Sequence, residues 1–272
     1  MSGVIAVLGF GEAGSLIAAD LAATGVTVRG FDPAVPAPPG VTDTGSDAEA
    51  VSGADLVLSV NSAKEAISAF RAALPGMAPG ALWADLNTAA PGIKAELAVL
   101  GAGLGISVTD IAMMAPVPGR GLRVPMIASG ESAVQVAAML GALGADIEVL
   151  DGPAGLAASK KLLRSVFYKG MAASIVEALE AARAAGCEPW LREHIAEELA
   201  KADGATVDRI VTGTQQHAVR RGAEMEAAAQ MLAELGVQPL MADASRALHE
   251  RLGITPAERD PGSRGTRSGE VL

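Results

Sequence analysis

Two adjacent lysines, Lys160 and Lys161, stand in an otherwise small and apolar stretch, GPAGLAASKKLLRS, at residues 152–165. A buried ammonium group is costly unless a partner or a function compensates for it. Lys160 would point about 100° away from Lys161 on a helix, as a solvated or salt-bridged side chain does. One helix face would instead collect residues three and four apart, a polar stripe on an apolar rod made of Ala158, Lys161, Ser165, Tyr168 and Ala172. Because a lysine amine can accept or donate a proton, the pattern favours Lys161 over Lys160 as the lysine with a chemical role. A lysine that snorkels at a domain edge is the alternative.

A second candidate site is the segment GFGEAG, which directly follows the apolar run GVIAVL. Its glycines have the spacing G-x-G-x-x-G. Gly9 would permit a tight turn, Gly11 would let the backbone approach a pyrophosphate, and Gly14 would let a strand and a helix pack closely. The segment predicts a dinucleotide site formed by Gly9, Phe10, Gly11, Glu12, Ala13 and Gly14. A turn with no ligand is the alternative.

Asp32 ends the next expected strand, at about the spacing where an acid binds the adenosine ribose hydroxyls. A carboxylate there would repel a 2′-phosphate, and the three residues that follow it include no arginine to bind one. The sequence therefore predicts NAD in preference to NADP, although NADP is not excluded. A turn cap is the alternative role for Asp32.

Apolar runs bounded by turn residues indicate the elements that must position these side chains. Strands are expected over 3–8, 26–32, 55–60, 81–86, 106–111, 124–128 and 146–150, with alanine-rich helices among them. Strands alternating with helices predict an α/β fold, a Rossmann-type doubly wound parallel sheet. The proline-rich segment 32–40 is expected to be a surface loop.

From Gly155 onward the strand signal stops, and an all-helical domain is expected, joined to the sheet by a long helix. That helix would cover 155–185, which is apolar on most sides, and further helices are expected over 189–201, 204–220, 222–235 and 240–252. We therefore expect a Rossmann domain over 1–153, a helical substrate and dimerisation domain over 154–254, and a disordered tail over 255–272.

Composition restricts the class of protein. The chain has 272 residues, 50% of them hydrophobic and only 3% aromatic, which suits a core of small aliphatic side chains. The net charge of −10 argues against a nucleic-acid or anionic-membrane partner, so an anionic small-molecule substrate would need a local basic pocket. The single cysteine, Cys187, excludes an internal disulfide and a cysteine-based zinc site, and we expect a small buried hydrophobe there. No metal site is expected, and with no targeting signal the protein is expected in the cytoplasm.

Together these segments resemble the β-hydroxyacid dehydrogenase superfamily, which includes 3-hydroxyisobutyrate and 6-phosphogluconate dehydrogenases. The resemblance covers nearly the whole chain in architecture. The lysine motif of that family, G-x-x-G-x-G-x-x-x-K-x-x-x-N, is matched by Gly152, Gly155, Ala157, Lys161 and Ser165. The resemblance implies that Lys161 is the catalytic acid/base, with Ser165 in the place of the family's asparagine.

Two further segments carry the resemblance. DLNTAAP at 85–91 looks like the family's D-x-S-T-x-x-P loop, which implies that Asn87 and Thr88 lie near the nicotinamide ribose. A helix N-cap is the alternative for these two residues, and both roles could hold. VNSAKEA follows the preceding strand, so Val60 and Asn61 are expected to contact the cofactor.

The chain departs from the family in the substrate region. DIAMMAPVPGRG stands where hydroxyisobutyrate-type enzymes have D-A-P-V-S-G-G, and Met113, Met114 and Ala115 fall at the Ser-Gly-Gly positions. This argues against hydroxyisobutyrate as the substrate. Tyr168, on the Lys161 face, is a further candidate for substrate contact.

The helical domain has a polar cluster of its own. His217, Arg221 and Glu224 are spaced four and three apart, so we expect them on one helix face, where histidine and arginine could bind a carboxylate or phosphoryl group. An Arg221–Glu224 ion pair with His217 exposed is the alternative. The stretches RRGAEM and KLLRSVFYKG resemble a branch of the superfamily whose C-terminal domain has no settled function.

The function that the resemblance implies is hydride transfer between NAD(P) and a small hydroxy acid, or a related alcohol or ketone. One alternative is an imine reductase-like enzyme, although such enzymes typically have Asp or Tyr in place of the lysine. Another is a dinucleotide-binding protein without turnover. Because the long helix is apolar on most sides, we also expect a homodimer formed through the helical domains.

Overall fold

The computed structural model describes residues 3–254, and the expected tail at 255–272 lies outside them. The chain forms two compact units that divide between Val166 and Phe167, inside one long helix. The sequence placed this boundary near residue 153. The difference arises because the first turns of the long helix are bonded to the sheet, through Asp110 and Ser129, and so belong to the N-terminal unit.

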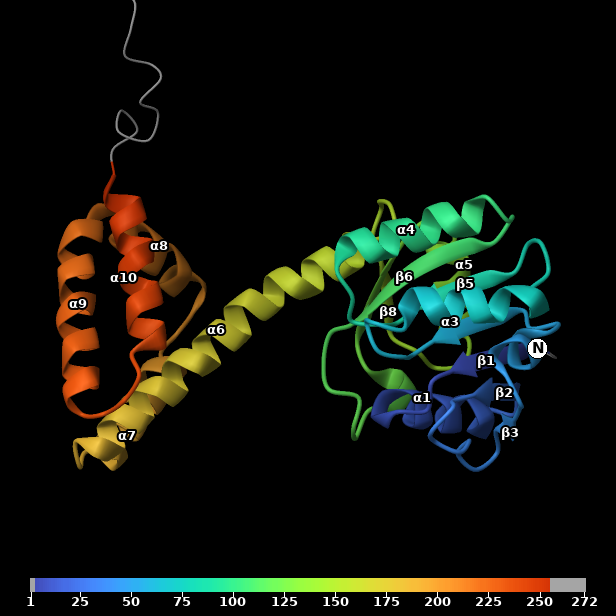
Figure 1. Ribbon diagram of the computed structural model, residues 1–272, viewed down its shortest axis with the longest axis horizontal. Helices are drawn as coiled ribbons and strands as arrows, with labels where there is room; N and C mark the ends of the chain where they lie inside the picture. The colour runs from blue at the N-terminus through green and yellow to red at the C-terminus, as the bar shows by residue number, and fades with distance from the viewer. Residues whose placement is uncertain (1–2, 255–272) are drawn as a thin grey trace, which may run out of the picture. The chain divides into compact units, whose positions relative to one another are not determined.

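Within the described residues, the N-terminal unit is an eight-stranded sheet with helices on both faces, as Figure 1 shows. The strand order is β3-β2-β1-β4-β5-β6-β7-β8. The order reverses at β1, so the switch point lies between β1 and β4, the place where open α/β sheets bind ligands. This confirms the Rossmann-type α/β sheet. The strands are β1 (Val4–Leu8), β2 (Thr27–Phe31), β3 (Thr42–Asp43), β4 (Leu56–Ser59), β5 (Leu82–Asp85), β6 (Ser107–Met113), β7 (Met126–Ser129) and β8 (Ile147–Val149).

Side chains of the central strands alternate between two cores. In β1, Ile5 and Val7 pack on the face covered by α1 and α5, whereas Ala6 and Leu8 pack on the face covered by α2, α3 and α4. Because both faces are buried, the strands are continuous apolar runs, which is why they were predictable from sequence. The helices of this unit are α1 (Glu12–Ala23), α2 (Asp47–Val51), α3 (Ala66–Ala73), α4 (Pro91–Ala102) and α5 (Ala133–Gly141).

One pair of the otherwise parallel sheet departs from the expected arrangement, because β7 runs antiparallel to β6. The connection between these strands, residues 114–125, contains only the short 3-10 helix η2 (Gly121–Arg123). A parallel pair usually needs a crossover α-helix, which this connection does not contain, whereas an antiparallel pair needs only a loop. The two-residue strand β3 was also not expected, since it follows the proline-rich loop and is too short to show an apolar pattern.

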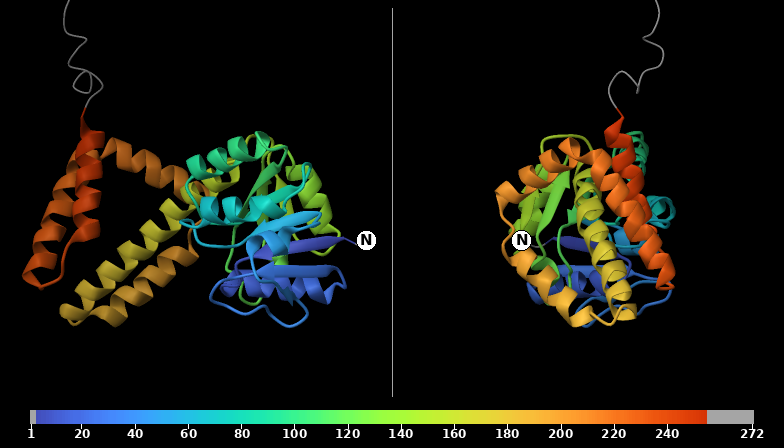
Figure 2. Two further views of the ribbon diagram at one scale, coloured as in Figure 1. Left: turned by 45° about the vertical axis from the view of Figure 1, so that its right-hand side comes forward. Right: turned by 90° about the vertical axis from the view of Figure 1, so that its left-hand side faces the viewer.

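The second unit is helical. The long helix α6 (Leu156–Ala184) is continuous from the sheet into this unit, as predicted. Its core is small and is formed by Ala181, Ala229, Leu232 and Ala242. The Glu177 carboxylate accepts backbone bonds from Met241 (2.7 Å) and Ala242 (2.9 Å), and so binds α6 to the amino end of α10. The remaining helices are α7 (Glu188–Ala200), α8 (Gly204–Gln216), α9 (Ala218–Glu234) and α10 (Leu240–Gly253), seen from two directions in Figure 2.

The helix boundary at His217 corrects one prediction. Helices were expected over 204–220 and 222–235, but His217 has φ −118° and ψ 24° and separates α8 from α9. His217 therefore does not share a continuous helix face with Arg221 and Glu224. The alternative, an Arg221–Glu224 ion pair, is also wrong, since Glu224 pairs with Arg220 and Arg221 donates to Thr214 Oγ1 at 2.6 Å.

Cys187, which directly precedes α7, is a half-buried free thiol, whereas a buried residue was expected there.

Within residues 3–254, no helix combines the length and the apolar character required to cross a bilayer.

Candidate active site

The glycine turn lies at the carboxyl end of β1. Gly9 has φ +96°, a left-handed conformation that side chains disfavour, and a Cβ there would lie 2.6 Å from Val60 O and from Asn61 Oδ1. Only glycine fits this position. The structure thus brings the glycine turn against the segment that follows β4, as the two predicted cofactor segments require.

The other two glycines differ in what surrounds them. A Cβ on Gly14 would lie 2.0 Å from the Gly9 carbonyl oxygen, so Gly14 is required by packing. A Cβ on Gly11 would meet nothing within 4 Å. Gly11 also precedes the first turn of α1, whose N–H groups at Glu12 and Ala13 no side chain caps. Open space beside uncapped helical N–H groups suits a phosphate, so this turn fits a dinucleotide.

Asp32 caps the turn that follows it, and it also lies beside the glycine turn, where it could bind the ribose. Its Oδ2 accepts from Phe10 N at 2.7 Å, and its Oδ1 caps the following turn by accepting from Ala34 N (2.8 Å) and Val35 N (3.0 Å). Burial raises the pKa of Asp32, but these three backbone donors lower it, and the net pKa lies below the ordinary carboxyl value. A negative charge therefore stands beside the glycine turn at neutral pH.

Asn87 is held at the end of β5 in the adjacent loop. Its Nδ2 donates to Asp85 Oδ2 (2.8 Å) and Ser59 Oγ (3.0 Å), and Ser59 Oγ also accepts from Asn61 Nδ2. Asn87 is 4% exposed, and its Oδ1 has no hydrogen-bond partner within residues 3–254. An unpaired buried acceptor is costly, so it suits a ligand hydroxyl.

The N-cap alternative for Asn87 and Thr88 is wrong, because α4 begins at Pro91 and no side chain caps it.

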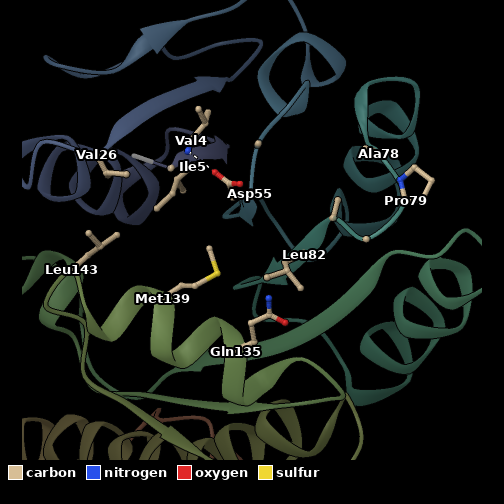
Figure 3. Close-up of a pocket in the computed structure, with 14 residues that line it drawn as sticks. Val4, Ile5, Val26, Asp55, Ala78, Pro79, Leu82, Gln135, Met139 and Leu143 are labelled. Atoms are coloured by element: carbon tan, nitrogen blue, oxygen red, sulfur yellow. Dashed lines mark hydrogen bonds between the residues drawn. The ribbon is translucent and has the colours of Figure 1, made fainter. Parts of the chain in front are cut away.

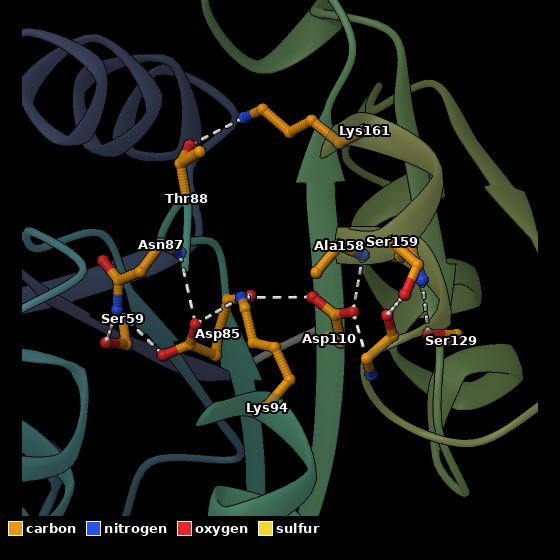
Figure 4. A network of polar contacts seen from close by, with 12 residues as sticks. Ser59, Asp85, Asn87, Thr88, Lys94, Asp110, Ser129, Ala158, Ser159 and Lys161 are labelled. Carbon is orange, nitrogen blue, oxygen red and sulfur yellow. Dashed lines mark hydrogen bonds and ion pairs between the residues drawn. The ribbon is translucent and has the colours of Figure 1, made fainter. Parts of the chain in front are cut away.

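Lys161 reaches the same loop from α6. Its Nζ donates to Thr88 Oγ1 at 2.8 Å, a contact shown in Figure 4. Lys161 is half-buried while Lys160 is exposed, as the helix geometry predicted. Ser165, one turn further along α6, is also half-buried. The structure therefore brings Lys161 together with Thr88 at the carboxyl edge of the sheet.

Sequence reasoning missed a buried ion cluster below this loop. Lys94 of α4 is 1% exposed, and its Nζ lies 2.5 Å from Asp85 Oδ1 and 3.1 Å from Asp110 Oδ1. Asp110 Oδ2 in turn accepts from the backbone of Gly155 (3.0 Å) and Ala158 (2.8 Å), at the start of α6 (Figure 4). The available signal was the spacing of Lys94 with the buried Leu97 and Gly101, which puts a lysine on the inner face of its helix.

The residues expected to contact the substrate come from three parts of the chain. Met113 and Ala115 pack against the sheet core next to α1 and α5, and Met114 packs against the cluster beside α6. Tyr168 is 48% exposed and makes an edge-to-face contact with Phe167. Tyr168, the exposed His217 and the half-buried Arg221 all belong to the second unit.

A large cavity lies at the opposite edge of the sheet. Its volume is about 600 Å³, and Figure 3 shows it between the amino ends of β1 and β5, with Ile5, Leu82, Gln135 and Met139 among its lining residues. Ligands of open α/β sheets bind at the carboxyl ends, so this cavity is not the candidate site. Within the described residues, no cluster of three or more His, Cys, Asp or Glu side chains could hold a metal ion.

Comparisons with known proteins find similar sequences and folds. Residues 182–252 match a domain of unknown function, DUF1932. A conserved hypothetical protein from Sinorhizobium meliloti 1021 is 30% identical, with a TM-score of 0.61 over 98% of this chain and 92% of its own. A conserved protein of unknown function, described as structurally similar to 3-hydroxyacid dehydrogenases, is 27% identical, with a TM-score of 0.59 over 92% of this chain and 96% of its own.

An imine reductase from Streptomyces aurantiacus shares the fold, with 20% identity and a TM-score of 0.76 over 91% of this chain and 93% of its own. No curated protein matches the sequence.

Proposed function

This chain belongs to the β-hydroxyacid dehydrogenase superfamily, in a branch with a DUF1932 helical domain, and we propose that it is an NAD(P)-dependent oxidoreductase. The observation that carries the proposal is the hydrogen bond between Lys161 Nζ and Thr88 Oγ1, made at the sheet edge that also presents the glycine turn. The substrate class is a small hydroxy acid or a related alcohol or ketone.

The cofactor would lie across the switch point. Its pyrophosphate would bind the open backbone at Gly11, and the unpaired Oδ1 of Asn87 would accept from a nicotinamide-ribose hydroxyl. The nicotinamide supplies the hydride donor or acceptor. Proton transfer and the positioning of the substrate would be carried out by side chains of this chain.

Lys161 is the proposed acid/base. When a carbinol carbon loses hydride, the hydroxyl proton must leave, and an uncharged Lys161 amine would accept it. In the reverse direction the ammonium would return a proton to the carbonyl oxygen. The Thr88 hydroxyl fixes the lysine amine, and Ser165, on the same helix face, would bind the substrate or a water.

Turnover assays separate this proposal from its two alternatives. The protein is mixed with NAD or NADP and a panel of hydroxy acids, and with the reduced cofactors and panels of ketones or cyclic imines, while absorbance of reduced nicotinamide is followed. Turnover of hydroxy acids or ketones supports the proposal. Turnover of imines alone would show an imine reductase, and tight cofactor binding without any turnover would show a non-catalytic binding protein.

We expect NAD to bind more tightly than NADP, by about tenfold or more, which corresponds to 1.4 kcal/mol. The reason is the negative charge of Asp32, whose lowered pKa keeps it ionised at neutral pH beside the glycine turn. Dissociation constants for both nucleotides test this, and Asp32→Asn should narrow the difference whereas Asp43→Asn, at the end of β3, should not. Equal or tighter binding of NADP by the unaltered protein would contradict the prediction.

We further propose that the chain is a homodimer formed through its helical units. No residue of α7 or α8 is buried within the described chain, and several large side chains of α6 are more than half exposed. Those side chains are Leu163 (71%), Val166 (74%), Phe167 (62%) and Val176 (56%). Large apolar side chains exposed along one long helix favour an interface with a second copy of the chain.

Light scattering at micromolar concentration should therefore give twice the mass of one chain, with an interface of about 2,000 Å² or more. Val166→Asp with Val176→Asp should shift the mass toward one chain, whereas Val99→Asp, a 73% exposed valine of α4, should not. A single-chain mass for the unaltered protein would refute the dimer.

A further inference from the structure

The buried Lys94 ammonium contacts two strands of the sheet. A lysine ammonium has three donors, and the Lys94 Nζ lies within reach of three oxygens: Asp85 O at 2.8 Å, Asp85 Oδ1 at 2.5 Å and Asp110 Oδ1 at 3.1 Å. Both carboxylates are 0% exposed. The ammonium therefore links the last residue of β5 to its register partner Asp110 in the middle of β6.

One branch of this cluster leads to the partner of Lys161. Asp85 accepts from the Asn87 side chain at 2.8 Å and from the Asn87 backbone at 3.3 Å. Thr88 is the next residue in the chain. A displacement of Asp85 would consequently move the hydroxyl that binds Lys161.

The other branch leads to Lys161 itself. Asp110 accepts from the backbone of Gly155 and Ala158, and Ala158 lies one helical turn before Lys161 on the same face. The positive end of the α6 dipole favours the Asp110 carboxylate at this position. Asp110 thus holds the first turn of α6 against β6.

The arrangement of Asp85 and Asp110 depends on the positive charge of Lys94 between them. The ammonium lies between two fully buried carboxylates, and without it the carboxylates would face each other with no counter-charge. Their repulsion would displace Asp85, Asp110 or both, and so change the geometry of both branches.

We propose that Lys94 is a positioning residue for Lys161: it binds the Asn87–Thr88 loop to the amino end of α6 and so sets the Lys161–Thr88 hydrogen bond. The inference rests on the proposed acid/base role of Lys161. It is testable without a substrate, because the quantity at issue is a contact between two side chains.

The test is a double-mutant cycle read by NMR. Reductive methylation with ¹³C-formaldehyde labels accessible lysine amines of the folded protein, and the signal absent from Lys161→Arg identifies Lys161. Thr88→Val should shift this signal in an otherwise unaltered protein, because the amine loses its hydroxyl partner. In a Lys94→Met background Thr88→Val should cause no further shift, because the two groups are already apart.

Leu97→Ala is the matched control, since Leu97 is 0% exposed on the same face of α4 and lies outside the ion cluster. It should destabilise the fold and keep the full Thr88→Val shift. If Lys94→Met does not fold, the charge-free variant Lys94→Met/Asp85→Asn/Asp110→Asn leaves no uncompensated buried charge and should show the same loss of the shift.

Two outcomes would overturn the inference: a full Thr88→Val shift in the Lys94 variants, or no Thr88→Val shift even with Lys94 present. Loss of turnover in Lys161→Ala is measured separately. If the cycle behaves as expected but Lys161→Ala retains turnover, the positioning stands and the acid/base role fails.

Discussion

Lys161→Ala should lower turnover by about two to four orders of magnitude and leave nucleotide affinity unchanged. Loss of the amine removes the group that transfers the hydroxyl proton. The nucleotide contacts expected at the glycine turn and Asn87 come from other elements, which the substitution does not touch. Steady-state rates with the best substrate of the panel, together with titration of reduced cofactor fluorescence, measure the two quantities separately.

Lys160→Ala is the matched control for this result. The two lysines are adjacent on α6, but Lys160 is exposed and turned away from Thr88. Its removal should leave turnover within about twofold of the unaltered rate, as expected of a surface substitution. If Lys160→Ala abolished turnover and Lys161→Ala did not, the assignment of the acid/base would be in error by one residue.

The features that sequence predicted correctly are those encoded in consecutive residues. The strands of a doubly covered sheet are unbroken apolar runs, and the glycine turn follows the first of them directly. Helical periodicity predicted that Lys160 and Lys161 point in different directions, and Lys161 is half-buried whereas Lys160 is exposed. The hydrogen bond between Lys161 and Thr88 was not predicted, since only the family resemblance placed Thr88, and it placed this residue near the nicotinamide ribose.

The features that sequence did not predict depend on contacts between distant segments. The cluster of Lys94, Asp85 and Asp110 joins a helix to two strands, and although the spacing of Lys94 places it on the inner face of α4, nothing in the sequence shows which carboxylates it meets. The break at His217 was also missed, because no glycine or proline marks it. The reversed direction of β7 was encoded only indirectly, by the lack of a helical pattern in the preceding connection.

The second large effect concerns the glycine turn. Substitution of Gly11 should change the affinity for NAD, whereas substitution of Gly14 should change the stability of the fold. Gly11→Ala should leave the fold intact, because a Cβ there meets nothing within 4 Å. It should weaken NAD binding by about tenfold or more, because the methyl group would occupy the space that the pyrophosphate needs. Gly14→Ala should lower the free energy of unfolding by about 3 kcal/mol or more, because its Cβ would lie 2.0 Å from the Gly9 carbonyl oxygen.

Thermal unfolding and titration with reduced cofactor distinguish these effects, with Gly141→Ala, whose Cβ would also meet nothing within 4 Å, as the control that should change neither binding nor fold. The comparison matters because a tight turn without a ligand would require glycine at positions 9 and 14 but would tolerate alanine at position 11 with no change in binding or stability. Unchanged NAD affinity in Gly11→Ala would therefore show that the turn serves packing alone. Reduced affinity with an unchanged unfolding temperature would show that the space beside Gly11 is kept open for the nucleotide, since no contact within the protein requires it.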